Sequence, residues 1–113
     1  MNTLKKDREF QLIYNQGKKT FGYYSLIFFL KNSSNTKNCG FVVSKKTGNA
    51  VCRNRIKRLY REYLRINDAR IKNGYDLILV GKRIAGQNIK SLSYDTLGRD
   101  LEKMFRQSNL FIM

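Results

Sequence analysis

The chain has 113 residues and no His, and its 23 Lys and Arg against 8 Asp and Glu give a formal net charge of +15 at pH 7. This length predicts one domain, residues 1–113, and a hydrophobic content of 42% is enough for a single core. The longest apolar run, residues 26–30, is far too short for a membrane span, and no apolar signal segment follows the N-terminus. We therefore expect a cytoplasmic protein with no membrane partner.

The positive charge is concentrated in one part of the chain. No acidic residue lies between Glu9 and Glu62, whereas eleven Lys and Arg residues do. Self-repulsion on this scale calls for a polyanionic partner. Nucleic acid is favoured over a membrane surface, because the apolar faces of the predicted elements are committed to a core.

Catalysis by the polypeptide itself is not indicated. General acid–base chemistry near neutral pH most often uses His, and metal-dependent phosphodiester cleavage needs clustered carboxylates, whereas the acids here are dispersed. Phosphate-binding and nucleophile motifs are also missing. We therefore predict no catalytic residue, and no set of metal ligands can be recognised in the sequence. The alternative of a protein nuclease that uses carboxylate-bound magnesium is disfavoured.

The first predicted elements are a helix and a hairpin. Asp7 is expected to cap a helix that ends before Gly17 and carries an aromatic and apolar stripe. Residues 23–30 and 40–44 are predicted strands, joined by the polar turn 32–38 into an antiparallel hairpin. A further extended piece is possible at residues 18–21.

A long helix is predicted from residue 50 to about residue 72, with Asn49 as its N-cap and Asn73-Gly74 as its stop. On a helical wheel one side is apolar and is expected to pack; it holds Cys52, Ile56, Leu59, Tyr60, Tyr63 and Ile66. The opposite side is polar and cationic; it holds Asn54, Lys57, Arg58, Arg61 and Arg65. With Glu62 as the one acid between residues 49 and 65, binding to an anion is favoured over a merely solvated face.

The C-terminal third predicts a strand and a helix. Residues 75–80 form a nearly continuous apolar run, which is typical of a strand covered on both faces inside a sheet. Ser93 is expected to cap a final helix, with Leu92 and Leu97 at the hydrophobic-staple positions. Together these elements predict an α+β fold, a two-layer sandwich with a mixed sheet of about four strands and three helices.

Residues 44–58, SKKTGNAVCRNRIKR, closely resemble the signature of the bacterial ribonuclease P protein subunit. The resemblance extends over nearly the whole chain through an early aromatic pattern and a late strand with a basic loop, represented by Phe10, Tyr14, Gly17, Tyr75-Asp76 and Lys82-Arg83. One departure is Ile84, where family members often have Pro. The resemblance implies an unusual left-handed βαβ crossover, as in the second domain of ribosomal protein S5, which periodicity alone does not predict.

The resemblance also implies a function. In that family an RNA subunit is the catalyst and uses Mg2+ to remove the 5′ leader of precursor tRNA, while the protein binds the single-stranded leader in a cleft between the sheet and the basic helix. The protein also contacts the catalytic RNA and broadens the substrate range. The implied partners are the ribonuclease P RNA, with one protein per RNA, and precursor tRNA, but not DNA; no cofactor is expected for the protein alone.

Two sets of site residues follow from the motif positions. The leader set combines aromatic platforms with backbone contacts: Phe10, Tyr14, Phe28, Ser44, Lys45, Asn54, Lys57 and Lys82. The catalytic-RNA set is cationic: Lys46, Arg53, Arg55, Arg58, Arg61 and Arg65. Packing in the core is the alternative for the three aromatic residues, and Phe29, with opposite strand parity, is expected in the core.

A second hypothesis remains open at this point. A small basic ribosomal protein, or another RNA-binding protein without a processing role, would share the basic helix and the sheet. Gly40-Phe41-Val42 matches a fragment of an RNA-recognition-motif strand, but the flanking basic and aromatic positions of that signature are missing.

Overall fold

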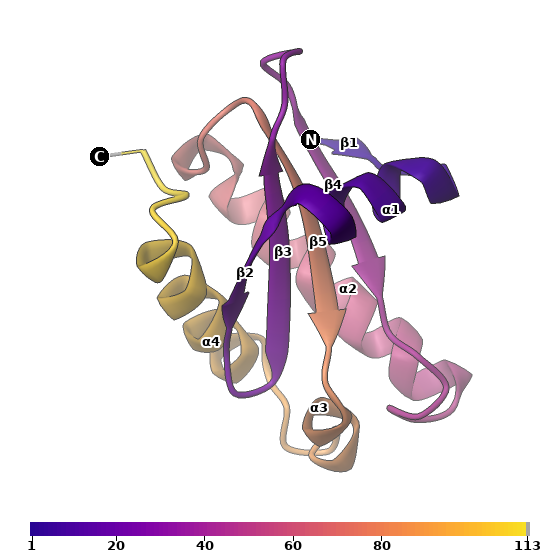
Figure 1. Cartoon of the computed structure of the whole chain (residues 1–113). Coiled ribbons are helices and arrows are strands. Elements are labelled where there is room, and N and C mark those ends of the chain that lie inside the picture. The colour runs from indigo at the N-terminus through magenta and orange to yellow at the C-terminus, as the bar shows by residue number, and fades with distance from the viewer. Residues whose placement is uncertain (113) are drawn as a thin grey trace.

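Five strands and four helices make up residues 1–112, the part of the chain that the computed structural model describes (Figure 1). The strands are β1 (Asn2–Thr3), β2 (Lys18–Phe21), β3 (Ser25–Lys31), β4 (Lys37–Val42) and β5 (Tyr75–Gly81). The helices are α1 (Asp7–Gln16), α2 (Ala50–Asn67), α3 (Arg83–Gln87) and α4 (Tyr94–Gln107), and a 3-10 turn, η1 (Asp68–Arg70), follows α2. The α+β class is confirmed, but β1 and α3 were not predicted.

The sheet has the order β1-β4-β5-β3-β2. The predicted hairpin between residues 23–30 and 40–44 is wrong, because β5 lies between β3 and β4, antiparallel to the first and parallel to the second. The continuous apolar run of β5 is buried on both faces, which places this strand at the centre. The hairpin partner of β3 is instead β2, with Lys19 opposite Phe28 and Phe21 opposite Leu26.

The connection from β4 through α2 to β5 is a left-handed crossover. In Figure 1 both strands point downward, α2 passes behind the sheet, and β5 lies to the left of β4. Parallel βαβ units are right-handed in almost all proteins. The exception expected from the family resemblance is therefore present.

The helices cover the two faces of the sheet unequally. On one face, α2 and α4 pack on the odd-numbered residues of β5, so that Leu77 and Leu79 lie in a core with Ile56 and Phe105. On the other face, α1 packs on Ile78 in a smaller cluster. Burial of each such Leu or Ile side chain contributes about 1.5–3 kcal/mol.

Two of the three predicted helix caps are confirmed. The Asn49 side chain accepts a hydrogen bond from the backbone N–H of Cys52 at 2.9 Å, and the Ser93 hydroxyl accepts one from Thr96 at 3.1 Å. Asp7 is not a cap, because α1 begins at this residue; instead the Glu9 carboxylate turns back to accept from the backbone N–H of Lys6 at 2.9 Å. This backbone hydrogen bond is the main reason that the pKa of Glu9 is lowered.

The C-terminal end of α2 differs from the wheel prediction. Ile66 is 54% exposed, so its place in the packed stripe is wrong, whereas Leu64 and Asn67 are buried. The helix ends at Asn67 and not at about residue 72 as predicted, and the Asn67 side chain donates to the carbonyl of Tyr63 at 2.9 Å. A buried amide therefore closes the last turn of the helix.

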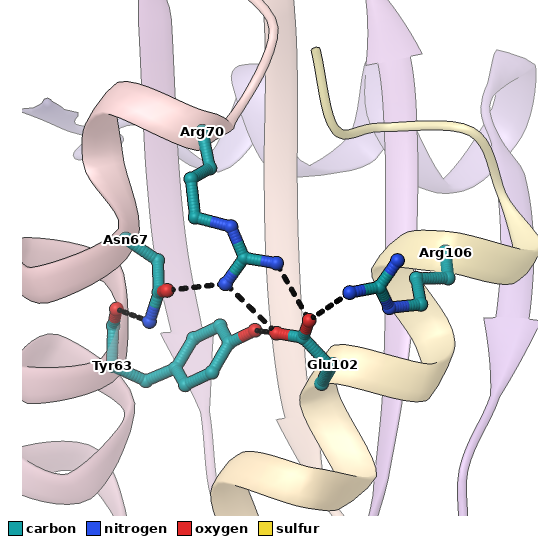
Figure 2. A network of polar contacts seen from close by, with 5 residues as sticks. All are labelled: Tyr63, Asn67, Arg70, Glu102 and Arg106. Atoms are coloured by element: carbon teal, nitrogen blue, oxygen red, sulfur yellow. Dashed lines mark hydrogen bonds and ion pairs between the residues drawn. The ribbon is translucent and has the colours of Figure 1, made fainter. Parts of the chain in front are cut away.

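A polar network joins this end of α2 to α4 (Figure 2). The Glu102 carboxylate accepts from the Tyr63 hydroxyl at 2.8 Å, from Arg70 at 2.6 and 3.1 Å and from Arg106 at 2.9 Å. These hydrogen bonds, chiefly those from Arg70, lower the pKa of Glu102 to about 2. Burial raises the pKa of Tyr63, and its hydrogen bond to Glu102 adds to this shift.

Candidate nucleic-acid interface

Three aromatic side chains that are distant in sequence meet on the face of the sheet that carries α1. The Tyr14 ring meets the Phe28 ring edge-on at 4.8 Å between centroids, and the Phe10 ring lies 6.5 Å from Tyr14. All three are only partly buried. We call Phe10, Tyr14 and Phe28 the aromatic face.

The local sequence explains how α1 presents these rings. Ile13 is fully buried against Ile78 and anchors the helix, while Phe10 and Tyr14, three residues before and one residue after it, project from the same side. Partial burial raises the pKa of the Tyr14 hydroxyl. The packing thus leaves ring surface accessible beside a firmly seated helix.

Lys19 adds a cation to the aromatic face. Its ammonium nitrogen lies 5.6 Å from the centroid of the Phe28 ring, in a cation–π contact between paired strands. Lys19 was not among the predicted site residues, because the side of the sheet on which it lies follows from the pairing of β2 with β3. The available signal was the alternation of residues 18–21.

The core alternative is answered in part by strand parity. Phe29 packs against the core beneath α2 and α4, as expected, whereas Phe28 packs on the opposite face. The aromatic face and α2 thus lie on opposite faces of the sheet. A single cleft between the sheet and the basic helix, with these aromatic residues on its floor, is therefore wrong for this chain.

The loop between β4 and α2 exposes polar and cationic side chains. Ser44, Lys45 and Lys46 are exposed, whereas Thr47 is buried and its hydroxyl donates to the Gly81 carbonyl at 3.4 Å. A Cβ on Gly86 of α3 would collide with the Thr47 carbonyl, so only glycine permits this contact. The loop is thus held at Thr47 while the three residues before it stay accessible.

Lys82 lies at the same end of the sheet as this loop, because β4 and β5 are parallel and their C-terminal ends lie side by side. Its ammonium group donates to the Gly22 carbonyl in the β2–β3 turn at 3.0 Å. The structure therefore brings Ser44, Lys45 and Lys82 to the same end of the sheet, and the Lys82 side chain is directed toward the β2–β3 turn.

The polar and cationic side chains of α2 differ in how far they already interact with other residues of the protein. Asn54 and Arg58 are exposed, and Arg53 and Lys57 are partly exposed. Arg55 donates to the carbonyl of Leu92 at 3.3 Å, and Arg61 lies over the Phe41 ring, 5.4 Å from its centroid.

Arg65 forms an ion pair with Glu62 at 2.6 Å, so its charge is compensated. Within residues 1–112, this is the one ion pair that involves a cation of α2. The cations of the other ion pairs are Lys37, Arg70 and Arg106.

Two further properties of residues 1–112 bear on function. In this part of the chain no group of three or more His, Cys, Asp or Glu side chains is placed to hold a metal ion. No helix there is long and apolar enough to cross a bilayer.

Residues 1–109 match the family model described as Ribonuclease P. The chain belongs to the ribonuclease P protein family. It is 54% identical over 110 residues to the ribonuclease P protein component of Fusobacterium nucleatum, covering 97% of this chain and 99% of that protein. It is 39% identical to the component from Natranaerobius thermophilus, covering 96% and 90% of the two chains.

Solved structures agree with this assignment. The ribonuclease P protein of Staphylococcus aureus superposes with a TM-score of 0.86 at 28% identity, covering 99% of each chain. The protein from Thermotoga maritima gives 0.87 at 28% identity, covering 95% and 97%. As part of the ribonuclease P holoenzyme, the chain functions in tRNA 5′ maturation, and the ribosomal-protein alternative is not favoured.

Proposed function

We propose that the aromatic face binds the single-stranded 5′ leader of precursor tRNA. Partly exposed rings give unstacked bases a platform that tolerates any sequence, and a nearby ammonium such as that of Lys19 favours the phosphates. The site also includes residues at the end of the sheet where β4 and β5 end, namely Ser44, Lys45 and Lys82. Two residues of α2, Asn54 and Lys57, extend it further.

The catalytic RNA subunit binds the remaining cations of α2 and of the loop before it. Lys46, Arg53, Arg55, Arg58 and Arg61 have no carboxylate partner in residues 1–112, and guanidinium groups bind phosphate through paired hydrogen bonds. Arg65 contributes less, because RNA must compete with Glu62 for it.

The chemistry in this proposal belongs to the RNA. In it the RNA subunit uses Mg2+ to hydrolyse the phosphodiester, and the protein supplies no catalytic residue. One copy of the protein, folded as a single domain of residues 1–113, binds one RNA in the cytoplasm.

The observation that carries the proposal is the separation of the two surfaces. The aromatic face lies with α1 on one face of the sheet, and α2 with its cations packs on the other. The rings of the leader set therefore lie on the opposite face of the sheet from α2. Asn54 and Lys57 are the members of the leader set that belong to α2, and no residue is assigned to both ligands.

The test is cleavage of precursor tRNA by the cognate RNA at low Mg2+, with and without this protein. We expect cleavage to require the protein under these conditions, and the protein to bind leader-bearing precursor more tightly than mature tRNA only when assembled with its RNA. Equal affinity for both ligands would contradict leader binding. Leader removal by protein that has been freed of RNA by nuclease treatment would contradict the assignment of catalysis to the RNA.

A further inference from the structure

Phe21 is a strongly exposed aromatic side chain outside the aromatic face. Its exposed fraction is 63%, although Phe21 is the last residue of β2 and Thr20, the residue before it in the same strand, is buried. Single exposed apolar residues are common and do not by themselves indicate a ligand. The surroundings of the Phe21 ring distinguish it from such a residue.

Strand register places Phe21 on the same face as Phe28. Lys19 is paired with Phe28, and Phe21, two residues on, is paired with Leu26. The contact of Lys19 with the Phe28 ring identifies this face, while Thr20 points the other way, toward Gln107 of α4 at 3.4 Å. Phe21 and Phe28 are therefore diagonal neighbours across the two strands, and such neighbours lie about 7–8 Å apart, within reach of aromatic side chains.

Helix α1 does not extend to this part of the sheet. Figure 1 shows α1 lying across the sheet at the end of β2 that is remote from the β2–β3 turn. Phe21 is the last residue of β2 and lies beside that turn. The surface therefore continues from the aromatic face along β2 to an uncovered ring.

The β2–β3 turn beside Phe21 is firmly held by hydrogen bonds. The Asp100 carboxylate of α4 accepts from the backbone N–H groups of Tyr23 and Tyr24 at 2.7 and 2.9 Å, and Gly22 donates to the Ser25 carbonyl at 2.9 Å. A residue next to a fixed turn loses little backbone freedom when it binds a ligand.

Two ammonium groups flank the ring along the same path. Lys19 precedes Phe21 on β2, and the Lys82 ammonium lies 3.0 Å from the carbonyl of Gly22, the next residue. The Asp100 carboxylate is also present at this turn, but both of its oxygens accept from backbone amides. Cations on either side of an exposed ring match the alternating phosphates and bases of a single strand.

We propose that Phe21 is an additional stacking residue for the 5′ leader and binds the base of a nucleotide beyond the one at Phe28. This inference rests on the proposed function of the aromatic face. Phe21 thereby extends the protein's footprint on the leader, with Lys19 and Lys82 near the adjoining phosphates.

The experiment measures equilibrium binding of the holoenzyme, reconstituted with its RNA subunit, to precursor tRNAs whose leaders lengthen one nucleotide at a time. For the wild type we expect affinity to rise with leader length to a plateau. Phe21→Ala should reach its plateau at a shorter leader and bind the longest leaders about five- to tenfold more weakly, with short leaders unaffected. Phe21→Trp should restore the wild-type profile, whereas Phe21→Leu should not, because leucine is apolar but cannot stack.

Ile66→Ala is the matched control, since it removes another exposed apolar side chain, on α2, and should leave the profile unchanged. Phe28→Ala tests the proposed function separately. Unchanged binding by Phe21→Ala at every leader length, beside a loss for Phe28→Ala, would overturn this inference alone. A profile for Phe21→Leu equal to that of the wild type would also overturn it, and unchanged binding by both alanine variants would overturn leader binding itself.

Discussion

Gly40 of β4 lies directly beneath the ring of Phe10, and a Cβ at position 40 would come within 2.5 Å of the ring's Cζ atom. The backbone of a central strand thus determines how deeply one ring of the aromatic face can sit. Glycine at this position is explained by close approach.

Gly40→Ala is expected to push the Phe10 ring outward and to weaken the binding of leader-bearing precursor. The loss of stability should be about 1 kcal/mol, the low end for overpacking, because the ring can swing away. Binding titrations and thermal unfolding measure the two effects. Gly98→Ala on α4 is the control: its Cβ would meet Tyr63 at an ordinary 3.6 Å, so stability should rise by up to about 1 kcal/mol with unchanged binding. Wild-type leader affinity in Gly40→Ala would argue against a role for the position of Phe10.

Tyr14→Ala should weaken the binding of leader-bearing precursor by about 1–3 kcal/mol and hardly change that of mature tRNA, because one stacking platform is removed. The measurement is binding of both ligands to the reconstituted holoenzyme. Tyr75→Ala is matched to it, since Tyr75 is also a partly buried tyrosine but packs with Phe29 on the other face. Equal losses for both ligands would return Tyr14 to a purely structural role.

Replacing Arg58 and Arg61 together by Ala should weaken binding of the RNA subunit and flatten the slope of log K against log salt by about one to two units, because fewer counterions are released. Arg65→Ala should change the slope less, since Glu62 already compensates its charge. Salt titrations of RNA binding provide the comparison. An unchanged slope in the double variant would show that these guanidinium groups do not contact phosphate.

Glu102 should make stability depend on acidic pH. Its pKa is about 2 in the folded protein, held down mainly by Arg70, whereas an unfolded Glu titrates near 4.3. The folded-state pKa is depressed, so the stabilisation is complete above about pH 4.3 and is lost as the pH falls toward about 2. Glu102→Gln should lower stability at pH 7 by about 1 kcal/mol and lose less stability across that acidic range. Denaturant titrations at several pH values test this, and parallel pH profiles of the two proteins would contradict it.

Local features of the fold could be predicted because they depend on neighbours in sequence. The caps at Asn49 and Ser93, and the opposite sides taken by Phe28 and Phe29, follow from residue chemistry and strand alternation. The order of the strands could not, because insertion of β5 between β3 and β4 is a pairing between distant segments. Handedness of the crossover has no local signature either.

The candidate site shows the same division. The spacing of Phe10 and Tyr14 on a helix predicts that they share a side, and the contact of the Tyr14 ring with Phe28 of β3 places that side against the sheet. Lys19 was missed because its position depends on register. The pairing of Arg65 with Glu62, three residues apart on a helix, could have been recognised from spacing alone.

The central position of β5 also determines when this protein can form during synthesis. Both of its neighbours precede it in the chain, so β3 and β4 remain unjoined until residue 81 has left the ribosome. The aromatic face and the basic helix α2 therefore gain a common scaffold late and together. Nascent chains that stop short of β5 present many cations without an ordered surface, and such fragments should bind RNA without selectivity.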